Sequence, residues 1–521
     1  MLYAFVTIMN QMVCRMDKRK SILNITVSVG FKILTMLLAI VVKRVLISTC
    51  GNDINGLNAL YLSVIGFLSV AELGVGSAIT FCMYKPIVAG DTDTVSALYH
   101  LFRRIYLLVG GVILAGGLVI TPFINHFAKD YDATHVNMHL TFLLMLVSVV
   151  LTYLFSCKTS LINAYKNNYI TTAITSGGLV LQNVLQIAVL LLTRSFVWYL
   201  ACRIVAVCVQ WAVTEVITRR RHRKILSNRQ KLSPPVKVEL LKNIKAMFMH
   251  SIGYTLVNTV DGVVISAFVG VSALGMFSNY TLVLTSLSEV LKLIFTSLTS
   301  VIGHLYVESG KTSTRKYSEA FHLLNFVLGT VFFLGYYAVI DSLIAIVFYE
   351  ELMVARTISL VITLNGFIQF MRQSALVFRQ ATGTFYYDRF KPLVEGGFNL
   401  VLSLLFVQWF GVAGVLVATI CTNLFICHVV EPYVLYKYAF DASPKAYYWH
   451  NYNRILLFAG ALLVLDRCMW HGGNKWTEFL VNGCLSVAFS VSMCAVVMWL
   501  NRDLCRHLFE KLRQEFQRKH A

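Results

Sequence analysis

Long apolar segments recur from one end of this chain to the other, and they restrict the possible folds more than any other feature. Each runs for about 20 residues or more, the length at which an α-helix crosses a hydrocarbon core about 30 Å thick. Of the 521 residues, 57% are hydrophobic and only 13% are charged, and no soluble domain of ordinary composition buries so much apolar surface. We therefore predict an all-α integral membrane protein.

This pattern predicts fourteen transmembrane helices, because only helices and closed barrels can pair all of their backbone N–H and C=O groups in lipid. Their predicted ranges are 24–48, 57–83, 105–127, 139–163, 168–193, 196–218, 246–269, 276–303, 321–348, 354–379, 390–410, 412–436, 452–470 and 478–500. They give a cytoplasmic N-terminus 1–20, a six-helix bundle 21–218, a basic cytoplasmic linker 219–245, a second six-helix bundle 246–436, two additional helices 437–500 and a basic amphipathic cytoplasmic tail 501–521. Residues 1–15 make a poor secretory signal, so we interpret Met16, which opens "MDKRK", as the better start of the chain.

The charge of the chain is arranged as in a membrane protein. The net charge is +20, but Lys and Arg gather in short stretches between the apolar segments, which is the positive-inside pattern and not a nucleic-acid footprint. Their distribution predicts that both termini are cytoplasmic. The linker 219–245 holds ten Lys or Arg against one Glu, and we interpret it as an anchor near anionic headgroups. The cysteines stand singly, and no pattern predicts a metal or another cofactor.

A motif near the start of the chain returns further along. "GNDINGLNALY" at 51–61 and "GVSALGMFSNY" at 270–280 share Gly, Gly and Tyr at an offset of 219. The same offset pairs Gly110 with Gly329 and 177–178 with 396–397, so we predict an internal duplication. Because the offset covers six predicted helices, both copies would enter the bilayer in the same direction. Two such bundles, related by an axis along the membrane normal, are expected to enclose a central cleft of the alternating-access kind.

Charged residues inside the spans are the candidates for function, since each costs about 2.5–3.5 kcal/mol at the bilayer centre on insertion scales. Those nearer to helix ends, such as Lys43 and Arg44, could instead extend to the interface. Glu289 and Lys292 are three residues apart on one helix and could simply neutralise each other. On the spans expected to line the cleft, cations outnumber anions, which favours an anionic ligand such as a phosphate. We expect substrate contacts from Lys43, Arg44, Glu72, Lys292 and Arg372.

One stretch carries a family resemblance. "GLNALYLSVIGFLSVAELGVGSAITFCMYKPIVAGD", residues 56–91, resembles the polysaccharide flippases, of O-antigen and teichoic-acid type, of the multidrug/oligosaccharidyl-lipid/polysaccharide (MOP) exporter superfamily. The resemblance implies a carrier of undecaprenyl-diphosphate-linked oligosaccharide in a bacterial plasma membrane, with membrane lipids and possible glycan-assembly enzymes as partners. It also implies that Lys43 and Arg44, in "VVKRVL", occupy the place of a basic pair common in relatives, with Lys in place of Arg at the first position.

Other functions stay open on the sequence. A cation-coupled drug antiporter of the same superfamily is disfavoured because its cleft should be acidic. A membrane-embedded polysaccharide polymerase or ligase would usually carry a substantial external loop, and the predicted external loops are short. A non-transporting scaffold is a third possibility. No phosphate-binding loop of an ATPase is present. Asp261, Glu72 or Glu289 could couple a proton or cation, or the substrate gradient alone could drive transport.

Overall fold

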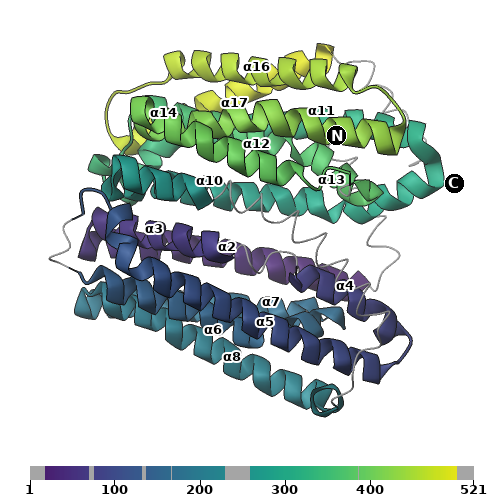
Figure 1. The fold of residues 1–521 in the computed structure, drawn as a ribbon. Helices are drawn as coiled ribbons and strands as arrows, with labels where there is room; N and C mark the ends of the chain where they lie inside the picture. Colours follow the sequence, from purple (N-terminus) through teal and green to yellow (C-terminus); the bar gives the residue numbers. More distant parts are fainter. Residues whose placement is uncertain are drawn as a thin grey trace. The chain divides into compact units, whose positions relative to one another are not determined.

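The computed structural model describes residues 18–69, 75–131, 136–165, 167–228, 259–384 and 387–500. Every regular element in these ranges is helical (Figure 1). Glu72, Met16, residues 229–245 of the linker and the tail 501–521 lie outside the described residues. The chain divides into two compact units, which we describe separately. The N-terminal unit contains 24–278 and 392–415, and the C-terminal unit contains 279–391 and 416–521 together with 1–23.

The N-terminal unit is built from long helices (Figure 1). Asp91 caps one of them, since its carboxylate accepts a hydrogen bond from the backbone N–H of Thr94 at 2.9 Å. Arg194 takes a left-handed conformation in the turn between the last two long helices. The helices are α2 Lys18–Cys50 from Asn24 onward, α3 Asn52–Leu68, α4 Val75–Val88, α5 Thr92–Ile120 with η2 Thr121–Phe127, α6 Met138–Ala164, α7 Asn168–Thr193, α8 Phe196–Ser227 and η3 Ile265–Val269. The first turns of α10 Val271–Ser297 and residues 392–415 of α14 Lys391–Thr422 complete the unit.

The C-terminal unit contains several interrupted helices. Gly310 has a positive φ inside α11 Thr299–Val347 and divides it into two helical parts. Two π-helical segments, η6 Asn423–Cys427 and η7 Leu435–Phe440, flank α15 His428–Val434. The remaining helices are η4 Glu350–Leu352, α12 Arg356–Met371, α13 Gln373–Thr382, α16 Lys445–Cys468 and α17 Lys475–Leu500. Its core is rich in aromatic side chains from α10 to α16, such as Phe295, Phe367 and Phe458, all fully buried.

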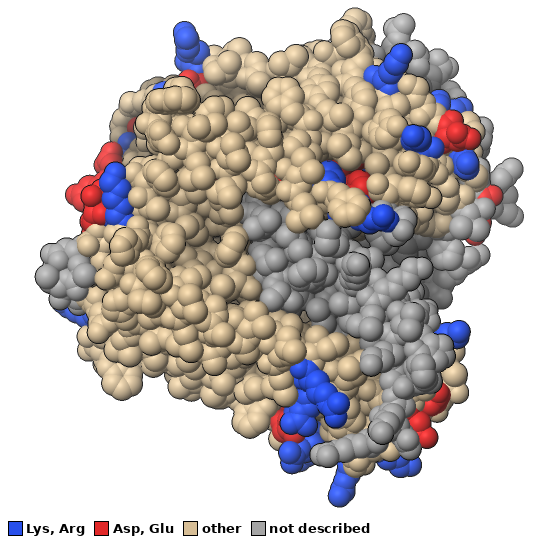
Figure 2. Space-filling view, in the orientation of Figure 1, with Lys and Arg blue, Asp and Glu red and all other residues tan. Residues whose placement is uncertain are grey.

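The helices are long and apolar enough to cross a membrane. Among the described residues, eight meet length and composition criteria for a span: Gly30–Cys50, Thr92–Phe127, Met138–Ala164, Tyr169–Thr193, Phe196–Ser227, Gly310–Val347, Lys391–Phe440 and Lys475–Trp499. In the space-filling view, Lys, Arg, Asp and Glu lie mainly toward the edges, with broad uncharged areas between them (Figure 2). Large apolar side chains such as Leu108, Leu192 and Val491 are exposed, as expected of a protein whose surface faces lipid. The protein is therefore a multi-pass membrane protein.

Matched glycines support the internal duplication. Gly51 and Gly270 both have a positive φ and both stand directly before a helix, α3 and α10 respectively. Gly110 of α5 packs against the side chain of Tyr153, and its counterpart Gly329 of α11 packs against the ring of Phe370. The predicted break between spans 390–410 and 412–436 coincides with Gly411, where φ is positive and the backbone is not helical.

The two copies of the repeated motif also contact each other, within the N-terminal unit. A Cβ atom added to Gly56 would lie 2.0 Å from the carbonyl oxygen of Val271, and one added to Gly275 would lie 2.7 Å from that of Asn52. The offset of 219 converts the first contact into the second. Both helices therefore approach each other through glycine, because any side chain would separate them.

Candidate functional site

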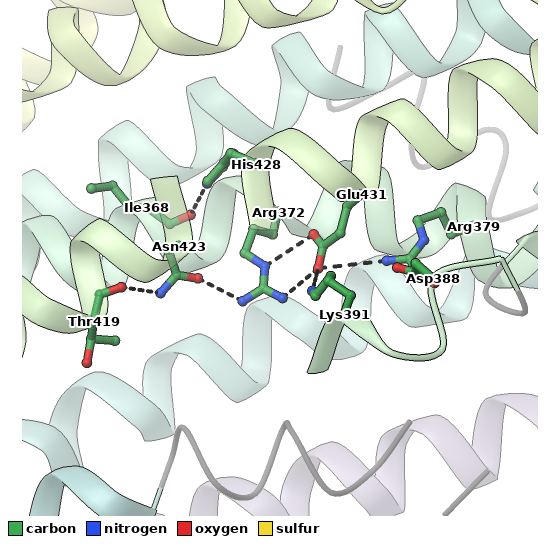
Figure 3. Close-up of polar contacts among 9 residues, drawn as sticks. All are labelled: Ile368, Arg372, Arg379, Asp388, Lys391, Thr419, Asn423, His428 and Glu431. Atoms are coloured by element: carbon green, nitrogen blue, oxygen red, sulfur yellow. Dashed lines mark hydrogen bonds and ion pairs between the residues drawn. The ribbon is translucent and has the colours of Figure 1, made fainter. Parts of the chain in front are cut away.

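Charged side chains gather deep in the C-terminal unit around Glu431. The carboxylate of Glu431 accepts hydrogen bonds from Arg372, from Nε at 3.2 Å and from Nη2 at 2.6 Å, and from Nζ of Lys391 at 2.5 Å (Figure 3). Nη1 of Arg379 lies 3.7 Å from the same carboxylate, while Nη2 of Arg379 is paired with Asp388. We call these five residues the Glu431 cluster: Arg372, Arg379, Asp388, Lys391 and Glu431.

Irregular helix geometry brings these side chains together. Arg372 stands at the junction of α12 and α13. Facing it, the π-helical segment η6 begins at Asn423, whose amide oxygen accepts a hydrogen bond from Nη1 of Arg372 at 2.7 Å. The amide nitrogen of Asn423 donates to the carbonyl of Thr419 at 2.9 Å, four residues earlier in its own helix. Such single turns of π-helix are common at functional sites because they rotate the side chains that follow.

The Glu431 cluster has more positive than negative charge. Three cations, Arg372, Arg379 and Lys391, face two carboxylates, and the side chains of Glu431 and Arg379 are 1% and 2% exposed. Charges removed from water in this way are retained only when they are paired and hydrogen-bonded. The guanidinium of Arg372 is the more open member, at 16% exposure, and it presents a planar fork suited to carboxylate or phosphate.

Two further expected residues belong to the same unit. Lys292 of α10 interacts electrostatically with both Glu289 and Arg372, so three of the charges singled out in the sequence lie in one neighbourhood. Lys292 is partly buried, whereas Glu289, one turn earlier on the same helix, is exposed. The pair is therefore not enclosed.

The expected basic pair of α2 lies in the N-terminal unit. Nζ of Lys43 donates to the hydroxyl of Ser278 at 2.8 Å, and Nδ2 of Asn55 lies 3.4 Å from the same hydroxyl. Asn55 also donates to the carbonyl of Gly275 at 3.0 Å. Lys43 is thus held at the contact between the two motif copies, in which α3 and α10 approach through glycine. Arg44, the next residue, is exposed.

The other candidates separate from these groups. Asp261 is partly buried in the helical turn before η3, in the N-terminal unit. Glu72 lies outside the described residues. Near the end of α6, Lys158 is paired with Glu215 of α8, which also accepts from Nε of Arg219 at 2.5 Å.

Sequence reasoning missed most of the Glu431 cluster. Glu431 falls inside the predicted span 412–436, Arg379 ends the predicted span 354–379 and Lys391 opens the predicted span 390–410. The rule that charges within spans are functional candidates would have included all three if it had been applied up to the span ends. Their mutual contacts could not be foreseen, because the π-helical turn that begins at Asn423 and the helix junction at Arg372 depend on tertiary packing.

No family model matches the chain, and no curated protein matches it in sequence. Solved structures do match. Lipid II flippase MurJ in an inward closed conformation aligns over 93% of this chain and 100% of its own, with a TM-score of 0.64 at 14% identity.

Two transporters of the MOP superfamily match over most of the chain as well. An inward-facing multidrug resistance transporter of the MATE family aligns over 79% of this chain and 97% of its own, with a TM-score of 0.60 at 14% identity. A transporter from Pyrococcus furiosus is described as having a binding pocket of reverse polarity. It aligns over 85% of this chain and 97% of its own, with a TM-score of 0.52 at 15% identity. The protein therefore has the all-helical fold shared by MOP-superfamily transporters.

Proposed function

We propose that this protein is a flippase that moves an undecaprenyl-diphosphate-linked oligosaccharide from the inner to the outer leaflet of a bacterial plasma membrane, with both termini cytoplasmic. The observation that carries the proposal is the positive charge held inside the fold, above all Lys292 beside Arg372 and the excess of cations in the Glu431 cluster. A diphosphate is a ligand that such groups bind well, and Arg can bind it with two parallel hydrogen bonds. The fold shared with MurJ supports the same class of substrate.

In the mechanism we propose, the interior cations receive the diphosphate while the polyprenyl chain stays in the lipid. Alternating access requires two bodies that move as units, and the chain divides into two compact units. The diphosphate must bind with similar affinity in both states, because a large difference would trap one of them. Glu431 then has a positioning role, since its carboxylate holds the guanidinium of Arg372 through Nε and Nη2.

A cation-coupled drug antiporter is the second candidate, and the fold shared with a MATE-family transporter is the observation that favours it. Asp261 or Glu289 would then bind the coupling cation. Among the described residues the carboxylates nearest to Arg372 are engaged by cations, which leaves this part of the interior poorly suited to an organic cation. A polymerase or ligase acting on the same lipid-linked donor has no support from the comparisons.

Neutralising Lys292 tests the proposal. We expect Lys292→Gln to reduce the initial rate of flipping of a lipid-diphosphate oligosaccharide by about tenfold or more at subsaturating substrate. The reason is that a charge-assisted hydrogen bond contributes about 1.5–3 kcal/mol to binding. Flipping would be measured in sealed liposomes by the access of an external modifying enzyme to the labelled sugar. Lys311→Gln is the matched control, because Lys311 is 54% exposed in a weak pair with Asp441 and should leave the rate unchanged. Equal rates for wild type and Lys292→Gln would contradict the role of Lys292.

A further inference from the structure

The N-terminal unit contains a groove between α7 and α8 that the proposed transport mechanism does not use. It has a volume of about 730 Å³. We call it the α7/α8 groove, and it is lined by Tyr169, Ile170, Ala173, Ile174, Gly177, Gly178, Leu181, Val209, Gln210, Val213, Ile217, Arg220 and Arg221. From this groove we infer that the protein has a specific binding site for one anionic phospholipid of the leaflet at the basic end of α8.

Helical periodicity builds the walls of the groove. The lining residues of each helix follow one face, at spacings of three and four, so the groove runs along the helices rather than across them. Glycine makes it deep. A Cβ atom added to Gly177 would meet nothing within 4 Å, so the space above it is open, while Gly178 lies directly against the side chain of Gln210.

The length of the groove fits one leaflet. Its lining on α7 extends from Tyr169 to Leu181, which at 1.5 Å per residue is about 18 Å. Half of a hydrocarbon core is about 15 Å thick. A single acyl chain of a phospholipid therefore matches the groove, whereas a long polyprenyl chain would extend well beyond it.

The charge at one end of the groove indicates the headgroup. Arg220 and Arg221 both line the groove and both are exposed, at the end of α8 that opens the basic segment predicted to be cytoplasmic. Basic pockets between transmembrane helices on that side typically bind lipid phosphates. Tyr169 lies at the same end and is 43% exposed, as is common for aromatic residues at the level of the headgroups. Apolar walls with two guanidinium groups at one end fit a phosphodiester with its acyl chain.

Photo-crosslinking tests this site in the full-length protein. Phosphatidylglycerol with a diazirine on one acyl chain would be added to the protein in phosphatidylcholine liposomes, and labelled peptides would be mapped by mass spectrometry. We expect labelling within 169–181 and 209–217 that excess phosphatidylglycerol removes and excess phosphatidylcholine does not. An equal effect of both lipids would overturn the proposal.

Variants separate the two parts of the site. Arg220→Gln/Arg221→Gln should reduce the labelling by about tenfold or more, because each cation near an anionic headgroup raises the binding constant about fivefold. Gly177→Leu should reduce it by filling the groove, at a position where an added Cβ atom meets nothing within 4 Å. Arg103→Gln/Arg104→Gln removes two exposed arginines from α5 and should leave labelling unchanged. Labelling that persists in both groove variants would contradict the site.

A competition arm distinguishes the occupant. Undecaprenyl diphosphate, added over the same concentration range, should compete no better than phosphatidylglycerol. Competition more than tenfold stronger would overturn the phospholipid assignment and make the groove a subsite for the transported substrate. Because flipping is measured separately, the failure of this inference leaves the proposed function standing.

Discussion

Glu431→Gln is expected to destabilise the C-terminal unit by about 3–5 kcal/mol, the cost of removing one partner from a buried ion pair. The substitution keeps the size of the side chain but leaves Arg372, Arg379 and Lys391 with the single carboxylate of Asp388. The result would be a large fall in the midpoint of thermal unfolding, measured on purified protein in detergent, with lower yield of folded protein.

Two companion variants make this prediction specific. Arg372→Gln/Glu431→Gln should be more stable than Glu431→Gln alone, because the double change removes a cation together with its partner. Glu350→Gln should be almost neutral, within about 1 kcal/mol, since Glu350 is 70% exposed where it pairs with Lys475. If Glu431→Gln and the wild type have the same midpoint of thermal unfolding, the Glu431 cluster does not hold these helices together.

Gly56→Ala is the second change with a large expected effect. The new methyl group would lie 2.0 Å from the carbonyl oxygen and 2.8 Å from the carbonyl carbon of Val271, and neither backbone atom can rotate away. α3 and α10 would have to separate, at a cost of about 1–3 kcal/mol or more. The contact that holds Lys43 against Ser278 should loosen as well. The measurement is again the unfolding midpoint, together with the protease sensitivity of the 270–278 region.

A matched glycine isolates the effect of the close approach. A Cβ atom added to Gly111 of α5 would meet nothing within 4 Å, so Gly111→Ala should be neutral or slightly stabilising, by up to about 1 kcal/mol through helix propensity. The reciprocal Gly275→Ala, which would place a Cβ 2.7 Å from the carbonyl oxygen of Asn52, should also destabilise. Equal stability of Gly56→Ala and Gly111→Ala would show that the two motif copies do not pack as described.

Much of the fold could be predicted because a membrane makes simple demands on a sequence. A span must be apolar over a fixed length, and every backbone N–H and C=O group in lipid needs a hydrogen-bond partner. These two requirements predict the all-helical class. Glycine was informative for a related reason. Gly51, Gly270 and Gly411 occupy backbone conformations that other residues rarely adopt, so their positions in the sequence marked real helix boundaries.

The candidate site was less predictable, because the sequence shows where charges are but not which of them face one another. Lys292 and Arg372 were expected, and the structure brings them into one neighbourhood. Glu431 was not, although among the described residues three cations contact its carboxylate. Its partners come from α12, α13 and α14 and meet it only because helices are interrupted at Arg372 and Asn423. Such interruptions depend on tertiary packing, which a single sequence read by local periodicity does not reveal.

The most direct test of the central claim is a flipping assay on the wild-type protein in sealed liposomes that contain a labelled lipid-diphosphate oligosaccharide. We expect that the sugar equilibrates between leaflets much faster than in protein-free liposomes, and that a lipid-linked sugar without phosphate is not moved. If the folded protein moves no lipid-diphosphate sugar but takes up an organic cation when a proton gradient is imposed, the flippase is contradicted and the antiporter is correct.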